Sequence, residues 1–227
     1  MEQEQTILKA NGMTVPKLAK LELNLISENL GKQFELEQRL NQMRRLSLEF
    51  AKRSLINAGR IEGNIYFMSI GKSVPMLDKV SATMKSLSFP AFVIDAVHIL
   101  HGDFGAFGPN DLIVAASKSG HTKELNTTLE YLRAKEVPFW YMTMAKSDDE
   151  VVLSLCREDQ CIFLEPCDEI DGMNRVPTVS PIVFQLILDA IAVNAAGTQL
   201  EMTPADFLLN HPGGDIGKFL RKDLNKE

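Results

Sequence analysis

The sequence predicts an α/β protein of three layers, in which a five-stranded parallel sheet is flanked by helices. Five short runs rich in Val, Ile and Phe follow one another along the middle of the chain, and such runs suit strands buried on both faces. Helical stretches separate the runs, and this alternation requires right-handed crossovers and a doubly wound sheet. The length of 227 residues, of which 45% are hydrophobic and 24% charged, fits one such domain.

The first part of the chain predicts helices that precede the sheet. Between Pro16 and Gly59 helix breakers are rare, and apolar residues recur at helical spacing. We expect Gly31 to separate two helices and Gly59 to end the second one. Residues 1–34 are expected to form a helical extension in front of the main domain.

Predicted strands and helices alternate from Gly63 onward. The strands are expected at Ile65–Ile70, Ala91–Val97, Asp111–Ser117, Val137–Met144 and Cys161–Glu165. The helices between them are expected at Val74–Leu87, Lys123–Lys135 and Asp148–Arg157. A longer helix is expected at Pro177–Asn194, because its apolar residues fall at i, i+3 and i+4 and would face the sheet. Residues 204–221 are expected to form a short helix, a turn at His-Pro-Gly-Gly and another helix.

Charge and composition disfavour several classes of protein. A net charge of -6 makes nucleic acid a poor partner. We find no run of about 18 apolar residues, as a membrane-spanning helix needs, and no secretory signal pattern at the N-terminus. The three cysteines lack a C-x-x-C pair, so we expect small core residues in a reducing cytosol rather than a disulfide framework or zinc ribbon; they are Cys156, Cys161 and Cys167. We therefore expect a cytoplasmic protein without membrane or nucleic-acid partners.

Two polar turns follow the first and third predicted strands, at Ser69–Ser73 and Ser117–Thr122. Ligands of parallel sheets bind beyond the carboxyl ends of the strands. Free N–H groups at a helix N-terminus attract anions, and a phosphate can accept from many donors at once. Each turn alone could be an ordinary helix cap, but two at neighbouring strand ends favour a phosphate site. Walker A and G-x-G-x-x-G patterns are absent, which disfavours a nucleotide triphosphatase or a Rossmann dehydrogenase.

Four histidines and one acidic loop are candidates for acid–base chemistry. Histidine exchanges protons readily near neutral pH. All four are expected in loops or turns, where they could equally be exposed without a role: His98, His101, His121 and His211. The His-Pro-Gly-Gly turn would fix the direction of His211, which makes it the stronger candidate. Glu169 lies in a loop that could simply be solvated, and no spacing supports a metal site.

Five motifs in one order resemble the sugar isomerase (SIS) domain. They are G-K-S at 71–73, H-G-D at 101–103, S-x-S-G-x-T at 117–122, P-T at 177–178 and H-P-G-G at 211–214. The last is the most diagnostic, because many other SIS proteins lack it. The resemblance covers about residues 35–221, leaves 222–227 as a tail, and is strongest to single-domain arabinose 5-phosphate isomerases of the Kdo pathway.

The resemblance implies a SIS-type, flavodoxin-like fold and self-association as a dimer or tetramer, with sites at subunit junctions. The implied reaction interconverts D-ribulose 5-phosphate and D-arabinose 5-phosphate through a cis-enediol and needs no cofactor. The implied catalytic residues are Lys72, Glu169, His211 and His101. The implied substrate- and phosphate-binding residues are Ser73, Ser117, Ser119, His121, Thr122 and Thr178. The base is either Glu169 or His211, and no metal is implied.

Several residues depart from the family pattern inside the implied site. The family turn usually has Asn and Glu where this chain has Lys118 and His121, and a glutamate stands where it has His98. Ser69 replaces a glycine, Arg175 is added to the acidic loop, and the regulatory CBS modules are absent after the domain. These changes keep two alternatives open: a SIS module that senses a sugar phosphate or nucleotide sugar without turnover, and an oligomeric scaffold with a relict site.

Overall fold

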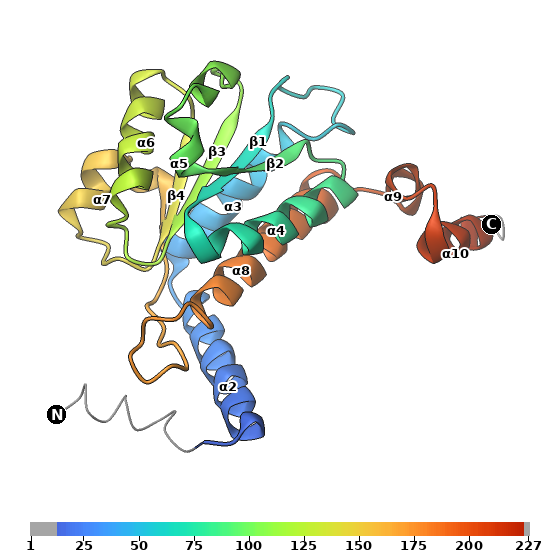
Figure 1. Cartoon of the computed structure of the whole chain (residues 1–227). Coiled ribbons are helices and arrows are strands. Elements are labelled where there is room, and N and C mark those ends of the chain that lie inside the picture. The colour runs from blue at the N-terminus through green and yellow to red at the C-terminus, as the bar shows by residue number, and fades with distance from the viewer. Residues whose placement is uncertain (1–12, 225–227) are drawn as a thin grey trace.

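Five parallel strands form the central sheet of the computed structural model, which describes residues 13–224 (Figure 1). The strand order is β2-β1-β3-β4-β5, the flavodoxin-like order that we expected. All five predicted runs are confirmed as strands, each slightly shorter than its run. The strands are β1 (Ile65–Ser69), β2 (Ala91–Asp95), β3 (Leu112–Ser117), β4 (Phe139–Thr143) and β5 (Cys161–Phe163).

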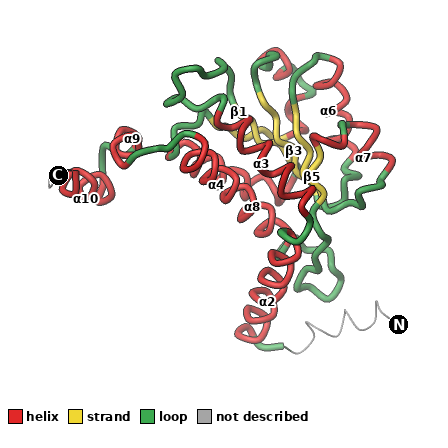
Figure 2. Tube along the Cα trace, turned by 180° about the vertical axis from the view of Figure 1, so that it is seen from behind, coloured by secondary structure: helices red, strands yellow, loops and turns green. Residues whose placement is uncertain are grey.

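Helices cover both faces of the sheet, which confirms the three layers (Figure 2). One face packs against α3 (Glu37–Ala51), α4 (Val74–Ser86) and α8 (Ser180–Asn194), and the other against α5 (Ala96–Ile99), α6 (Lys123–Ala134) and α7 (Glu150–Leu155). Because successive strand residues point to opposite faces, Val114 of β3 joins the first core and Ile113 the second. Strands buried on both sides explain the continuous apolar runs.

The N-terminal helix α2 (Val15–Gln33) runs through Gly31, so the predicted break at that glycine is wrong. The helix ends instead where the buried Arg39 guanidinium donates to the carbonyl oxygens of Lys32 and Gln33. Gly59 does not end α3 either, because the helix stops at Ala51. There the Asn57 side chain donates to the last carbonyl of the helix. In the predicted extension 1–34, residues 1–12 lie outside the described part of the chain, and the extent of the extension stays a prediction.

Helix α8 begins at Ser180, three residues after the predicted start at Pro177. It continues through a π-helical turn, η4 (Ala195–Gln199). Together these residues form a stretch of 20 residues with a mean hydropathy of 1.5, long and apolar enough to cross a membrane, so the expectation that no such stretch exists is wrong. Half of it is buried inside the protein, where Val183, Phe184 and Ile187 pack in the first core.

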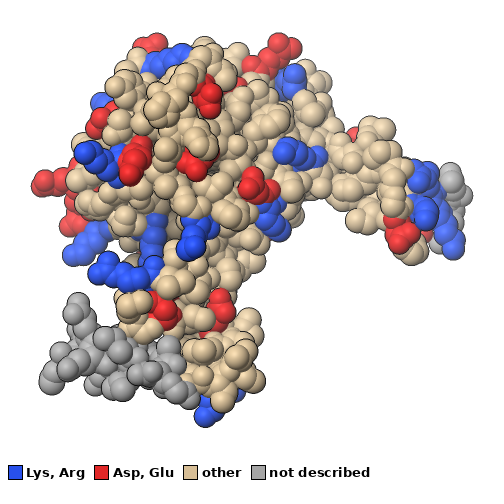
Figure 3. Space-filling model, in the orientation of Figure 1, with Lys and Arg blue, Asp and Glu red and all other residues tan. Residues whose placement is uncertain are grey.

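The C-terminal segment forms the predicted helix, turn and helix: α9 (Pro204–Asn210), then α10 (Gly214–Leu224). Figures 1 and 3 show this arm standing clear of the body that contains the sheet. The arm exposes large apolar side chains, including Leu209 at 79%, Ile216 at 55% and Phe219 at 67%. A helix with one apolar face gains its stability by covering that face.

Two of the three cysteines are bonded to each other, which corrects the expectation of unpaired core residues. Cys156 follows α7 and Cys161 begins β5, and the short helix η3 (Glu158–Gln160) brings them together with a Cα–Cα distance of 6.6 Å. Both are buried. Cys167 has a free thiol.

Candidate active site

The predicted site lies where the strand order reverses. The chain leaves β1 for the edge strand β2 and then crosses back to β3, so the turns after β1 and β3 diverge to opposite sides of the sheet and leave a crevice between them. The two strands are hydrogen-bonded neighbours, paired from Ile65 with Leu112 onward. The expectation that these two polar turns lie side by side is therefore confirmed.

The turn after β3 is ordered by its own hydroxyl groups. The Oγ of Ser117 lies 3.0 Å from Oγ1 of Thr122 and accepts from the N–H of Gly120 at 3.2 Å. The Oγ of Ser119 accepts from the N–H of His121 at 3.1 Å. Helix α6 begins immediately after Thr122, so its positive end faces the turn.

Gly120 is required by the shape of this turn. Its φ of +72° lies in the left-handed region, which only glycine adopts without cost. A Cβ at this position would lie 2.7 Å from Cγ2 of Val152, 3.0 Å from Cβ of Ala145 and 3.1 Å from Oγ1 of Thr143. The glycine thus lets the turn sit directly on the ends of β4 and α7.

A cavity of about 450 Å³ opens between the turns. Five of the predicted site residues line it together: Ser73, Ser117, Ser119, Thr122 and Glu169. The other lining residues are Ser69, Ile70, Ala116, Lys118, Leu125, Asn174, Arg175, Pro177 and Ser180. The N-termini of α4 and α6 both meet this cavity, since Ser73 and Thr122 are their N-cap residues. Such ends attract anions.

Glu169 is the most heavily hydrogen-bonded side chain of the cavity. Its Oε2 accepts from the N–H groups of Thr178, Val179 and Ser180 and from the Thr178 hydroxyl. Its Oε1 accepts from Lys118 Nζ at 2.7 Å and from the Ser180 hydroxyl. The carboxylate therefore satisfies the N–H group of Ser180, the first residue of α8, and those of the two residues before it, which explains why the helix begins at Ser180 rather than at Pro177.

These bonds decide the protonation of Glu169. Burial alone raises its pKa, but the hydrogen bonds from Lys118 and Ser180 and from the Thr178 and Val179 N–H groups outweigh that effect and lower the pKa to about 2. The carboxylate is therefore anionic at neutral pH and has little affinity for a proton. A general base works best with a pKa near the working pH, so this geometry suits an anchor better than a base.

Three predicted residues lie outside the cavity within one chain. Lys72, in the short helix η1 (Gly71–Ser73), is exposed, as is His101, which precedes the short helix η2 (Asp103–Ala106). His121 turns away, and its Nε2 lies 2.8 Å from Oδ2 of Asp149 at the start of α7. That hydrogen bond lowers the pKa of Asp149. His98 lies in the short helix α5 rather than in the loop we expected.

The remaining predicted residues are positioned by their neighbours. Thr178 binds Glu169 instead of lining the cavity. His211 lies at the end of α9, on the arm, where its ring stacks on Phe207 with centroids 4.1 Å apart and its Nδ1 lies 3.0 Å from the Phe207 carbonyl oxygen. Its ring is held by Phe207 of α9 rather than by the His-Pro-Gly-Gly turn that we expected to fix it, and it does not line the cavity of its own chain.

Sequence reasoning did not name nine of the lining residues as site members, among them the polar residues Lys118, Asn174, Arg175 and Ser180. Lys118 and Arg175 were visible only as departures from the family pattern. Asn174 adopts a φ of +53° and accepts from the Glu169 N–H through its side chain, a role that tertiary structure assigns. Ser180 precedes Pro181, and a serine before a proline at a helix start is a signal that could have been used.

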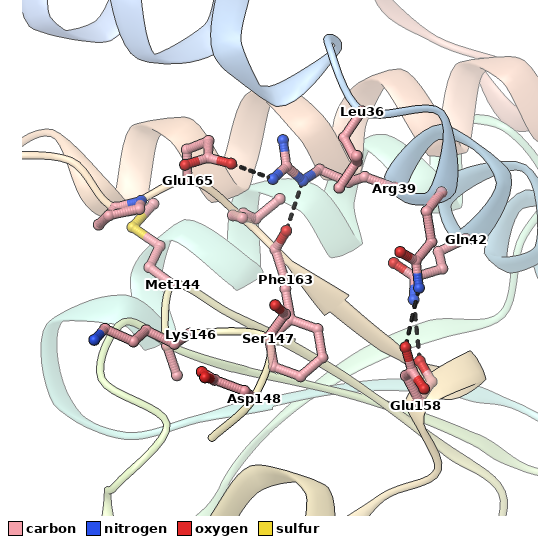
Figure 4. A pocket seen from close by; sticks show the side chains of 14 residues that line it. Leu36, Arg39, Gln42, Met144, Lys146, Ser147, Asp148, Glu158, Phe163 and Glu165 are labelled. Atoms are coloured by element: carbon pink, nitrogen blue, oxygen red, sulfur yellow. Dashed lines mark hydrogen bonds and ion pairs between the residues drawn. The ribbon is translucent and has the colours of Figure 1, made fainter. Parts of the chain in front are cut away.

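A larger cavity of about 540 Å³ lies beside the ends of β4 and β5, and several of its polar groups bind one another (Figure 4). Arg39 donates to the Phe163 carbonyl oxygen and to Glu165, and Gln42 donates to the Glu158 carbonyl oxygen. None of the predicted site residues lines it. Its side chains tie α3 to the end of β5, so we place the candidate site in the smaller cavity. Among the described residues 13–224, no three His, Cys, Asp or Glu side chains are grouped to hold a metal ion.

The fold and this cavity define a flavodoxin-like α/β domain with one polar, hydroxyl-lined site at its switch point. Residues 60–194 match the model of the SIS domain. The chain belongs to the SIS domain family, and the resemblance drawn from its motifs is confirmed.

Three similar proteins illustrate the relation. An arabinose 5-phosphate isomerase, KdsD, of Escherichia coli (strain K12) is 30% identical over 170 residues, covering 72% of this chain and 48% of that protein. An uncharacterized protein of Rickettsia prowazekii is 32% identical over 164 residues, covering 72% and 50%. An Escherichia coli CFT073 protein solved in complex with arabinose 5-phosphate is similar in fold, with a TM-score of 0.72 and 24% identity over 88% of this chain and 100% of that one. The chain spans about half the length of the curated relatives it matches.

Proposed function

We propose that this protein is a phosphosugar aldose–ketose isomerase that interconverts D-ribulose 5-phosphate and D-arabinose 5-phosphate. The observation that carries the proposal is the convergence of two helix N-termini and the Ser117–Thr122 turn on one cavity that also contains Glu169 and Lys118. The phosphate would occupy the turn, and the sugar would extend toward Glu169. The name of the E. coli K12 relative and the arabinose 5-phosphate bound to the CFT073 protein support the same substrate class.

The proposed reaction moves protons only. A base removes a proton from carbon 1 of ribulose 5-phosphate, and the electron pair of the broken C–H bond forms a carbon 1–carbon 2 double bond. The π electrons of the carbonyl group move onto oxygen 2. The base then returns the proton to carbon 2, where the π electron pair of the carbon 1–carbon 2 double bond binds it. The proton of oxygen 1 passes to oxygen 2, which becomes a hydroxyl, and the electron pair of the broken O–H bond completes the aldehyde carbonyl group at carbon 1. No electrons leave the substrate, so the proposal includes no cofactor.

The base in this proposal is His211 of a second copy. Glu169 is too weakly basic, since its pKa is about 2, and no histidine is among the described residues that line the cavity. The arm that carries His211 stands clear of its own body and exposes Leu209, Ile216 and Phe219, which packing on a second copy would cover. The proposed dimer or tetramer would then complete each site across a junction. We also propose a cytoplasmic location, which suits an enzyme with a phosphorylated substrate.

A second candidate function is binding without turnover, as in a sensor of sugar phosphates. The specific observation that favours it is the chemistry inside the cavity of one chain. Its carboxylate is fully hydrogen-bonded, and Lys72, His101 and His121 all lie outside it. Such a cavity can hold an anion without supplying a group that removes a proton.

Turnover and the shared site are tested together by incubating the full chain with D-ribulose 5-phosphate and analysing the sugars. We expect D-arabinose 5-phosphate from the wild-type protein, and a loss of rate of at least about 100-fold in Lys72→Ala and His211→Ala. If Lys72 and His211 of one site come from different copies, mixing the two variants after subunit exchange restores about a quarter of the wild-type rate, because half of the dimers are mixed and each has one intact site.

Three outcomes separate the candidates. A thermal shift with ribulose 5-phosphate but no product supports the sensor. Undiminished turnover in both single variants removes the assigned roles of Lys72 and His211. Mixed variants that stay inactive contradict a site built from two copies, whereas the inactive single variants in separate tubes are the matched control.

A further inference from the structure

Lys118 is a charged residue of the cavity that the family pattern does not predict. It occupies the middle of the phosphate-binding turn, where the family usually has asparagine. Its side chain is 34% exposed and its Nζ lies 2.7 Å from Oε1 of Glu169, whose own side chain is 1% exposed. An ammonium group carries three donors, and among the described residues this one has Glu169 as its hydrogen-bonded partner. The ion pair with Glu169 fixes the Lys118 side chain, and the other N–H donors of its ammonium group lie next to the open cavity.

The ammonium group of Lys118 lies beside Glu169, away from the backbone of the turn to which Lys118 belongs. The backbone of Lys118 belongs to the serine turn after β3, but the four-carbon stem carries Nζ to Glu169, whose carboxylate binds the N–H groups at the start of α8. The turn hydroxyls and Glu169 line the same cavity. A sugar phosphate held by the turn would therefore have its carbon chain in the cavity that Lys118 also lines.

Lys118 is also the best positioned of the nearby cations. Lys72 is exposed and does not line the cavity. Arg175 lines the cavity from an exposed loop. Within residues 13–224, Lys118 alone among these three is fixed by an ion pair. The five other hydrogen bonds that the Glu169 carboxylate accepts hold that ion pair in place. A positioned cation stabilises developing negative charge more effectively than a mobile one, because it need not reorganise during the reaction.

On the basis of the proposed isomerase function, we propose that Lys118 is a catalytic residue that contacts the substrate oxygen on which negative charge develops in the enediolate, and that Glu169 is the positioning residue that holds its ammonium. The carbonyl end of the sugar phosphate contacts Nζ of Lys118, and the positive ammonium group pairs with the negative charge formed on oxygen 2. Glu169 supplies no proton in this scheme and acts through Lys118.

Two analogues test this role without turnover. D-arabinonate 5-phosphate has a carboxylate in place of the aldehyde, and D-arabinitol 5-phosphate has a neutral alcohol there. By calorimetric titration of the full chain we expect the wild-type protein to bind the arabinonate about 10- to 100-fold more tightly, the worth of a charge-assisted hydrogen bond in a partly buried site. Lys118→Met should lose this preference and bind the arabinitol as before. In turnover it should lower kcat at least about 100-fold with little change in KM.

The control is Lys20→Met, which removes the same charge from the exposed surface of α2, outside the cavity. It should leave both affinities unchanged.

Should Lys118→Met fail to fold, Lys118→Gln takes its place. A Lys118 variant that keeps the preference for the arabinonate overturns the proposal, as does one that loses both ligands equally, since Lys118 would then bind the phosphate. A wild-type protein that binds both analogues equally also overturns it but leaves the isomerase standing. Absent turnover with a preference that depends on Lys118 overturns the isomerase and the catalytic role of Lys118 with it, and leaves Lys118 as a binding contact of the sugar end of the ligand.

Discussion

Replacing Gly120 by alanine is expected to destroy the phosphate-binding turn and to lower the free energy of unfolding by about 3 kcal/mol. The left-handed φ of +72° costs an alanine about 1–2 kcal/mol. The added Cβ would lie 2.7 Å from Cγ2 of Val152 and 3.0 Å from Cβ of Ala145, and overpacking of this kind costs about 1–3 kcal/mol. To relieve it the turn must move away from β4, which displaces the hydroxyls of Ser117 and Ser119.

Chemical denaturation and titration with D-arabinose 5-phosphate measure the two effects of this substitution. The affinity should fall at least about 100-fold, since several phosphate contacts are lost at once. Gly31→Ala is the matched control, because a Cβ there meets nothing within 4 Å and the residue lies inside helix α2. It should raise stability by about 0.5–1 kcal/mol and leave the affinity unchanged. Equal effects of the two substitutions would contradict the structure of the turn.

The Glu169→Gln variant is expected to lose about 3 kcal/mol of stability at neutral pH, the value that corresponds to a pKa lowered from 4.5 to about 2. The amide can still accept from the N–H groups of α8 with its oxygen. Its NH₂ group then faces the Lys118 ammonium. Both groups are hydrogen-bond donors and neither can accept, so the ion pair is lost. Activity should fall with stability, because Lys118 is released.

The pH dependence of this stabilisation has a definite sign. The pKa of Glu169 is lower in the folded protein than its ordinary value, so the stabilisation is complete above about pH 4.5 and is lost as the pH falls toward about 2. Denaturation curves of the wild-type protein should show this loss, and those of Glu169→Gln should lack it. Glu130→Gln, on the exposed face of α6, is the control and should stay within about 0.5 kcal/mol of the wild type. A Glu169→Gln protein as acid-sensitive as the wild type would mean that Glu169 does not contribute this dependence.

The sheet was predictable because its strands are buried on both faces. Val114 and Ile113 face different helices, and this burial leaves continuous apolar runs that can be recognised without any fold. The predicted helix boundaries were wrong where hydrogen bonds from side chains outside the helix decide them. Helix α2 passes Gly31 and stops where Arg39 takes its last carbonyls, and α8 starts where Glu169 takes its first N–H groups. Both contacts join residues 6 to 10 positions apart, farther than the three- and four-residue spacings by which helices are recognised in a sequence.

The candidate site was predictable as far as the two strand ends and the acidic loop, since the strand ends of a parallel sheet share one edge. The six bonds around Glu169 were not predictable, because Thr178, Val179 and Ser180 look like an ordinary helix start. The positions of Lys72 and His211 outside the cavity were also hidden. Motif order places such residues in a family site, but it does not say which chain supplies them.

The central claim, that the cavity between the β1 and β3 turns holds one phosphorylated sugar, is tested most directly by a crystal structure of the full chain with D-arabinose 5-phosphate. We predict the phosphate within hydrogen-bonding distance of the hydroxyls of Ser117, Ser119 and Thr122, and the carbonyl end of the sugar beside Lys118. A sugar phosphate bound instead in the larger cavity beside Arg39 and Lys146, with the serine turn empty, would contradict the claim.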